Sequence, residues 1–293
     1  AAAHELRRLG HACTIYEASA ALGGLSATGV APYKMQADRA LEEVEWVLGI
    51  GGIEVRTGVA VGRDVGLREL RERHDAIFLG LGLGPDRALD VPGRELDGVS
   101  GAVEWIAQMK GGEVDLRGVR RAAVIGGGNT AIDAVRELLG LGVAEVTLIY
   151  RGAEAEMSGY AHEWAAAKVS GARAAFRALP VEYVGEGGAV RCVRVVPLDA
   201  ERRPIAGEER VIAAERVLLA IGQSRLGALV DGVEGVALDR GHVVVDADGA
   251  TGCPGIFAGG DCANGGKEVV NAVAEGRRAA QAIDRFLRRV EAQ

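Results

Sequence analysis

RAAVIGGGNTAIDAV, at residues 121–135, is the stretch of this chain that decides the fold. The apolar run 122–125 predicts a buried strand, and the three glycines at 126–128 then turn the chain into a helix that opens at Asn129. This spacing is the G-x-G-x-x-A form of the dinucleotide-binding fingerprint, with Gly126, Gly128 and Ala131 in its small positions. These positions allow a sharp turn, close approach of a pyrophosphate to the backbone, and tight helix–strand packing. The first N–H groups of the helix would then face the phosphates.

The flanks of the fingerprint fit a strand–helix–strand unit. The predicted helix continues to Gly140, and a second strand follows over Glu145–Tyr150. A purely structural glycine turn is the alternative, but the complete unit favours nucleotide binding.

Composition limits the functional classes. The chain has 293 residues, 48% hydrophobic and 26% charged, as expected for a globular protein of one or two domains. Its formal net charge of −7 argues against general affinity for nucleic acid. No apolar run reaches the length of about 18 residues that predicts a membrane span. The four cysteines and five histidines are dispersed without C-x-x-C or ligand spacing, so we expect structural roles, no metal site and a cytoplasmic location.

The N-terminal segment resembles the second half of another such unit. A helix is predicted over Ala1–Leu9 and a strand over Ala12–Tyr16, after which comes Glu17. An acid at this place can accept hydrogen bonds from a ribose diol. The matching glycine loop would lie before residue 1, so we expect an N-terminally truncated unit that lacks its first strand and loop. An incidental surface Glu17 is the alternative.

The rest of the chain predicts α/β architecture. Helices are expected at 37–48, 67–73, 99–109, 162–169 and 269–289, and strands at 53–56, 76–81, 191–197, 216–221, 242–246 and at the start of 255–261. Several of the apolar strands end in glycine, which suits close approach of a ligand. We therefore expect two Rossmann-like units, with residues 111–235 inserted between residues 1–110 and 236–293.

Five motifs together resemble the flavoprotein reductases that carry two dinucleotide-binding domains: IYEA at 15–18, LGGL at 22–25, VIGGGNTAID at 124–133, LLAIG at 218–222 and GIFAGGD at 255–261. GVAPYKM (29–35), FLGLGLGPDRALDVPG (78–93) and MSGYAHEWAAAKVSGA (157–172) are similar to a narrower branch. That branch contains the glutamate synthase small subunit and the flavin subunit of dihydropyrimidine dehydrogenase, and the first two of these stretches favour the latter.

The resemblance implies an FAD domain at 1–110 and 236–293 and an NAD(P)H domain at 111–235. It implies that the flavin nucleotide is bound by Glu17, Gly23, Gly24, Leu25, Gly82, Gly260, Asp261, Val269 and Val270. It implies that the nicotinamide cofactor is bound by Gly126, Gly128, Asn129, Thr130, Arg151 and Gly222. Arg151 follows the second strand of its unit, where a guanidinium suits the 2′-phosphate of NADP(H). Related chains often have a second basic residue at the next position, which is Gly152 here, so NAD(H) remains open.

The implied activity is electron input. NAD(P)H would reduce FAD, and the electrons would pass to the iron–sulfur clusters of a partner catalytic subunit or domain. No protein catalytic residue is required, because the flavin supplies the redox chemistry. A disulfide reductase would need a C-x-x-C pair, which the sequence lacks. A glutamate synthase small subunit and a non-catalytic nucleotide-binding fragment remain the alternatives.

Overall fold

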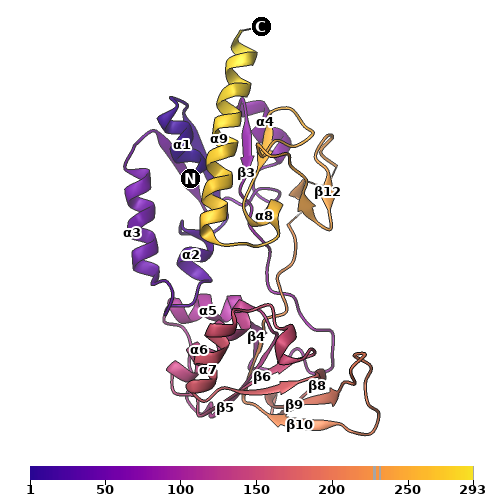
Figure 1. Cartoon of the computed structure of the whole chain (residues 1–293). Coiled ribbons are helices and arrows are strands. Elements are labelled where there is room, and N and C mark those ends of the chain that lie inside the picture. The colour runs from indigo at the N-terminus through magenta and orange to yellow at the C-terminus, as the bar shows by residue number, and fades with distance from the viewer. Residues whose placement is uncertain (227–228, 231, 293) are drawn as a thin grey trace. The chain divides into compact units, whose positions relative to one another are not determined.

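The computed structural model describes residues 1–226, 229–230 and 232–292. The chain divides into two compact units (Figure 1). The first comprises residues 1–27, 38–84 and 224–293, and the second comprises residues 28–37 and 85–223. Residues 28–37 and 85–110, which the sequence analysis assigned to the first domain, therefore belong to the second unit. The described residues of 224–235, which it assigned to the second domain, belong to the first unit.

A five-stranded parallel sheet forms the centre of the second unit, in the order β4–β11–β5–β6–β7. Its strands are β4 (Val99–Gly101), β11 (Arg216–Leu219), β5 (Arg121–Ile125), β6 (Glu145–Tyr150) and β7 (Arg173–Phe176). Helices α5 (Ala102–Lys110), α6 (Asn129–Gly140) and α7 (Ala161–Val169) accompany it, with the short 3₁₀ helix η1 (Glu154–Glu156) after β6. The order is that of a dinucleotide-binding sheet, in which successive strands add outward from the fingerprint strand.

Alternate residues of β5 pack into two different cores. Ala122 and Val124 join a cluster with the helices that includes Trp105 of α5 and Leu138 of α6. Ala123 and Ile125 face the opposite way and join a cluster with Tyr183. Tyr183 belongs to a three-stranded antiparallel sheet made of β8 (Ala178–Glu186), β9 (Ala189–Pro197) and β10 (Arg210–Ala213). Burial of both faces explains why the strand is continuously apolar.

The first unit contains two parallel strand pairs. They are β1 (Cys13–Glu17) with β2 (Ile53–Thr57), and β3 (Ile77–Leu79) with β14 (Ile256–Ala258). Within the described residues no backbone ladder joins one pair to the other. The remaining elements of this unit are α1 (Ala2–Arg8), α2 (Gly24–Thr28), α3 (Ala37–Leu48), α4 (Leu67–Arg73), the hairpin β12 (Leu238–Asp239) with β13 (His242–Val243), α8 (Asp261–Asn264) and α9 (Val269–Glu291).

Both faces of the β3–β14 pair are covered. Leu79 and Ile256 pack with Leu67 of α4 and Val243 of β13. Phe257 faces the other way, onto Ala279 and Ile283 of α9. Small residues allow α9 to approach α1 closely, because a Cβ at Gly276 would lie 3.2 Å from the backbone nitrogen of Ala2.

Several sequence expectations need correction. The strands expected at 76–81 and 216–221 are limited to Ile77–Leu79 and Arg216–Leu219. Residues 99–101 form strand β4 rather than the first turn of a helix, because they pair with β11 before α5 begins. The expected strand at 242–246 is limited to His242–Val243, and the glycine turn at 22–25 continues into α2. Among the described helices, none has both the length and the apolar character needed to cross a membrane.

The core of the second unit gives a direct stability test. Leu138 is fully buried between α6 and the sheet. We expect Leu138→Ala to lower the free energy of unfolding by about 2–5 kcal/mol, because a cavity is left beside the lost side chain. Urea unfolding followed by circular dichroism measures this change. Val169→Ala on α7, where the residue is 90% exposed, is the matched control and should change it by less than about 0.5 kcal/mol. Equal effects of the two changes would contradict the packing.

Candidate nucleotide-binding site

Gly126 lies where the carboxyl ends of three strands meet. Its N–H donates to the carbonyl of Ile149 at the end of β6, at 3.0 Å. A Cβ at this position would lie 2.3 Å from the carbonyl oxygen of Ala220, which follows β11, and φ is +148°. Only glycine satisfies both constraints, so the turn after β5 has no room for a side chain.

The next two glycines leave the start of α6 open. A Cβ at Gly127 would lie 2.5 Å from the ring of Tyr150, so this residue packs against β6. Gly128 precedes the first helical residue, and the nearest atom to a Cβ there would be Ser158 Oγ at 3.5 Å. The N–H groups of Asn129 and Thr130 belong to the first helical turn, which has no intrahelical acceptors for them. The space above Gly128 is therefore accessible to an anion.

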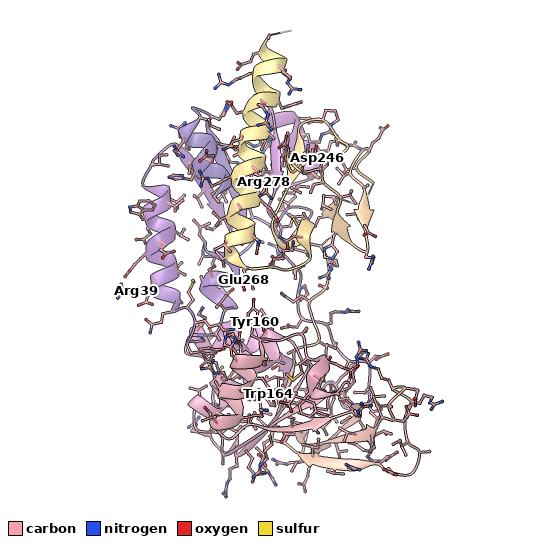
Figure 2. The ribbon with its side chains drawn as sticks, in the orientation of Figure 1. Arg39, Tyr160, Trp164, Asp246, Glu268 and Arg278 are labelled. Atoms are coloured by element: carbon pink, nitrogen blue, oxygen red, sulfur yellow. The ribbon has the colours of Figure 1, made fainter. Side chains whose placement is uncertain are left out.

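A loop between β6 and α7 supports this turn. The N–H of Gly159 donates to the carbonyl of Gly127 at 3.0 Å. The side-chain oxygen of Asn129 accepts the N–H of Tyr160 at 2.8 Å. Tyr160 and Trp164 lie at the start and in the first half of α7 (Figure 2). The sequence analysis used residues 157–172 only as a family marker and did not predict this support.

Arg151 follows the last residue of β6. Its side chain is exposed, and it has no ion pair or hydrogen bond within the described part of the chain. Nearby, Glu156 accepts the N–H of Ala153 at 2.6 Å and pairs with Arg202 at 2.9 Å. The backbone hydrogen bond from Ala153, followed by the side-chain hydrogen bond from Arg202, lowers the pKa of Glu156. The Glu156 carboxylate thus stabilises the turn after β6, while the Arg151 side chain remains available to a ligand.

The segment 28–37 is attached to α6 through a buried acid. Asp133 is 8% exposed, and it accepts a hydrogen bond from Tyr33 Oη and an ion pair from Lys34 Nζ at 2.7 Å. Lys34 also pairs with Glu163 at 2.9 Å, and the guanidinium of Arg136 lies 3.8 Å from the centre of the Tyr33 ring. The cluster holds α6 in place one turn below its phosphate-facing end. Sequence reasoning missed it, although both GVAPYKM and VIGGGNTAID had been singled out.

Those contacts shift two pKa values. Burial and the hydrogen bond to Asp133 raise the pKa of Tyr33. Burial lowers the pKa of Lys34, but its bonds to Asp133 and Glu163 outweigh that effect, so the pKa is raised.

In the first unit, Glu17 is half-buried at the end of β1. Its Oε1 accepts the backbone N–H of Ser19 at 2.8 Å and also the Ser19 hydroxyl. Its Oε2 has no hydrogen-bond partner within the described residues, so it is available to a ribose hydroxyl. The contacts with Ser19, two residues further on, therefore fix the orientation of the Glu17 carboxylate.

The two expected glycine turns of this unit have the left-handed backbone that favours glycine. Gly23 has φ +105°, and Gly24, the first residue of α2, has φ +51°. Leu25 is 37% exposed. Gly82, after β3, has φ +66° with open space beside it.

The segment after β14 brings the remaining predicted residues of the first unit together. The N–H of Gly260 donates to Glu275 of α9 at 2.7 Å, and Asp261 accepts the N–H of Lys267 at 3.2 Å. Val269 and Val270 are 50% and 70% exposed at the start of α9. Glu268 precedes them and caps the helix at Asn271 (Figure 2). The N–H groups of Val269 and Val270 are thus the ones left for a ligand.

Gly222 lies beside a cavity that the sequence did not predict. Its carbonyl accepts the N–H of Arg87 at 2.9 Å. The cavity, of 520 Å³, is lined by Asp86, Arg87, Ser100, Glu104, Leu219 and Gln223, among others. It lies within the second unit, at the carboxyl ends of β4 and β11. Gly222 itself is at its margin.

No three His, Cys, Asp or Glu side chains gather as a metal site in the parts of the chain that are described. Cys13, Cys192, Cys253 and Cys262 are all free thiols. Cys253 and Cys262 are buried, and burial raises the pKa of Cys262. This thiol therefore stays protonated and unreactive at neutral pH.

These features define an α/β protein with two dinucleotide-binding units, as the sequence predicted. Residues 1–276 match the family model described as pyridine nucleotide-disulphide oxidoreductase. The chain belongs to this family. The expected class, a pyridine nucleotide-dependent FAD oxidoreductase, is thereby confirmed.

Several relatives are similar over almost the whole chain. The beta subunit of NADP(+)-dependent formate dehydrogenase from Moorella thermoacetica is 36% identical, over 98% of this chain and 42% of the relative. The small chain of glutamate synthase [NADPH] from Mycobacterium tuberculosis is 33% identical, over 98% of this chain and 64% of the relative. The chain thus spans between about two fifths and two thirds of the length of these relatives. The expected resemblance to the glutamate synthase small subunit is confirmed, and that to dihydropyrimidine dehydrogenase stays a prediction.

Solved structures confirm the fold. FprA of Mycobacterium tuberculosis, in complex with NADPH, matches with a TM-score of 0.78 over 99% of this chain and 82% of that chain, at 19% identity. Thioredoxin reductase of Lactococcus lactis matches with a TM-score of 0.78 over 97% and 94%, at 20% identity.

The buried acid of α6 gives a pH-dependent prediction. We expect Asp133→Asn to lower the free energy of unfolding by about 1–3 kcal/mol at neutral pH, because Tyr33 and Lys34 lose a charged acceptor. Both donors have raised pKa values when folded, so their contribution is complete below about pH 10 and is lost as the pH rises through the raised values. Urea unfolding should therefore give a constant difference from wild type between about pH 6 and 9, and a smaller one above about pH 10.

Asp115→Asn is the control for this change. Asp115 is on the surface, where its side chain is 56% exposed and pairs with Arg117. It should alter the free energy of unfolding by less than about 0.5 kcal/mol. A difference at Asp133 that grew above about pH 10 would contradict the assigned hydrogen bonds.

Proposed function

We propose that this chain is the electron-input module of a larger oxidoreductase. Its second unit binds NADPH, its first unit binds FAD, and the electrons go on to iron–sulfur clusters of a partner subunit or domain. The observation that carries this proposal is the unobstructed start of α6 above Gly128, followed on the next strand by an available Arg151. This is the arrangement that takes a dinucleotide pyrophosphate together with a 2′-phosphate.

On the nucleotide side, the chain supplies position and charge. Gly126 and Gly128 would hold the pyrophosphate against the backbone, and Asn129 and Thr130 would donate their N–H groups to it. Arg151 would bind the adenosine 2′-phosphate, whose geometry suits a planar guanidinium. Asp133 and the loop at Gly159 keep the helix and the turn in place, so little reorganisation accompanies binding.

On the flavin side, the described residues fit an FAD. Among the described residues Glu17 Oε2 has no hydrogen-bond partner, so it could bind the adenosine ribose, and Asp261 follows β14, where it could bind a ribityl chain. The exposed apolar side chains of Val269 and Val270 offer contact to a ring, and their N–H groups favour negative charge near the helix start. Gly24 and Gly82 have open space beside them, because no other atom would lie within 4 Å of a Cβ at either position, and Gly23 and Leu25 would complete this lining.

FAD, when bound, supplies the acceptor for a hydride and a donor of single electrons. The protein contributes binding, orientation and electrostatics, and needs no acid–base or nucleophilic side chain of its own. The names of the relatives support a module that works with other subunits. One is a small chain and another is a beta subunit. A third, 30% identical over 98% of this chain and 48% of the relative, is the beta subunit of the NADPH-Fe(3+) oxidoreductase of Geobacter sulfurreducens.

Flavin reduction tests the proposal. The purified chain is mixed with FAD, freed from unbound flavin, and treated with NADPH or NADH without oxygen. We expect the chain to retain flavin. Both nucleotides should bleach its visible absorption, and NADPH should do so faster than NADH. Retained flavin that neither nucleotide bleaches would contradict hydride transfer, and no retained flavin would contradict the FAD site.

Gly128→Val separates nucleotide binding from folding. The nearest neighbour of a Cβ there is 3.5 Å away, so the chain should fold, but the new side chain occupies the space proposed for the pyrophosphate. We expect bleaching by NADPH to slow by at least about 100-fold, because the loss of two or more charge-assisted hydrogen bonds corresponds to that factor. The flavin content should not change. Gly140→Ala, at the other end of α6 with open space around it, is the control and should leave the rate unchanged. An unaffected rate in Gly128→Val would place the nucleotide elsewhere.

A further inference from the structure

The backbone of the second unit contains an unusual feature beside Arg151. In the described chain three residues other than glycine have a left-handed φ, and all three are arginines: Arg177 (+50°), Arg202 (+63°) and Arg240 (+47°). This conformation is unfavourable for a residue with a Cβ and persists where the surroundings enforce it. Two of the three, Arg177 and Arg202, lie at the same edge of the sheet as the fingerprint turn.

Arg177 is the direct neighbour of the turn after β6. Strands β6 and β7 are paired in parallel up to Tyr150 and Phe176, so Arg151 and Arg177 are the first residues beyond two adjacent strand ends. The N–H of Arg177 donates to the carbonyl of Gly152 at 3.0 Å. Its own carbonyl accepts the N–H of Leu198 at 2.7 Å. Two backbone hydrogen bonds thus fix Arg177 in its left-handed conformation.

Both arginines act on the same carboxylate. Arg202 Nη2 lies 2.9 Å from Glu156 Oε1, with about half of each side chain exposed. Arg177 donates through Nη1 to the carbonyl of Asp199 at 3.2 Å, and its charge also lowers the pKa of Glu156. Two guanidinium groups, those of Arg177 and Arg202, therefore act on one carboxylate, and the exposed Arg151 follows the neighbouring strand end.

Gly152 itself cannot carry a second basic side chain. A Cβ there would lie 2.7 Å from the ring of Tyr150 and 2.9 Å from Glu156 Oε2. The ring is held by the hydrogen bond from Tyr150 Oη to the carbonyl of Glu156, at 2.9 Å. Any additional positive charge next to Arg151 must come from a different element of the chain.

We propose that Arg177 and Arg202 complete the 2′-phosphate site begun by Arg151, and that Glu156 is the counter-ion that the phosphate displaces. The inference rests on the proposed binding of NADP(H) by the second unit, and it identifies what makes that unit select NADP(H) over NAD(H). Planar guanidinium groups match the geometry of a phosphate monoester, which carries close to two negative charges at neutral pH. Without nucleotide, Glu156 neutralises part of the cluster.

Calorimetric titration of the full chain with adenosine 2′,5′-bisphosphate and with 5′-AMP tests this assignment without flavin or turnover. Arg177→Gly removes the guanidinium while glycine accepts the left-handed backbone, so the variant should fold. We expect it to weaken binding of the bisphosphate by at least about ten-fold, the value of one charge-assisted hydrogen bond, and binding of 5′-AMP by less than about two-fold. Arg202→Gly should act in the same direction.

Two further variants complete the test. Arg173→Ala removes an arginine from the opposite end of β7, where it pairs with Glu145 at 2.5 Å, and should leave both affinities unchanged. Glu156→Gln removes the competing charge and should tighten bisphosphate binding while 5′-AMP binding stays the same.

The proposal is overturned if Arg177→Gly binds the bisphosphate as wild type does, or if it weakens both ligands equally. It is also overturned if wild type prefers 5′-AMP. Selective, Arg177-dependent binding in a chain whose flavin is not reduced would support this site and refute the electron-input function. Conversely, flavin reduction at equal rates by NADPH and NADH, with no change in Arg177→Gly, would support the electron-input function and refute this 2′-phosphate site.

Discussion

The second unit depends on one constraint, which is the close contact of the turn after β5 with the ends of the two neighbouring strands. Gly126 is bound to β6 through its N–H, and the carbonyl of Ala220 after β11 leaves no space for a Cβ. A side chain here would separate the three central strands of a parallel sheet. Because the turn is fixed from both sides, the first turn of α6 is presented at a defined place, where the N–H groups of Asn129 and Thr130 have no partner among the described residues. The same contact therefore determines both the packing of the sheet and the position of the anion site.

Helix α6 combines two electrostatic tasks within its first two turns. Its amino end, beyond Gly128, is left without a capping side chain, so its partial positive charge is available to phosphate. One turn further on, buried Asp133 is neutralised by Lys34 and accepts the Tyr33 hydroxyl. These local donors neutralise the Asp133 carboxylate. Its negative charge therefore does not oppose the binding of phosphate at the start of α6. Arg151 and the proposed partners Arg177 and Arg202 then provide positive charge at the adjacent strand ends.

Elements with strong local signals were predictable from the sequence. The buried strand at 121–125 and the helix that follows it carry the glycine spacing and apolar periodicity that identify them, and Glu145–Tyr150 matched to the residue. Strand β4 was missed because it has only three residues, all half-buried, and α5 begins directly after it. The attachment of residues 28–37 to α6 was missed because Tyr33 and Asp133 are 100 residues apart in the sequence. Arg177 had no signal, because arginine does not indicate a left-handed backbone and only the pairing of β7 with β6 places it beside Gly152.

The central claim is that the nucleotide lies across the carboxyl ends of β5, β6 and β7. Hydrogen–deuterium exchange of the full chain, with and without NADP⁺, tests this most directly. We predict protection of peptides that contain residues 126–131, 151–160 and 177, with no change in those that line the cavity beside Gly222. Protection confined to that cavity, or no protection at the start of α6 at saturating nucleotide, would contradict the account.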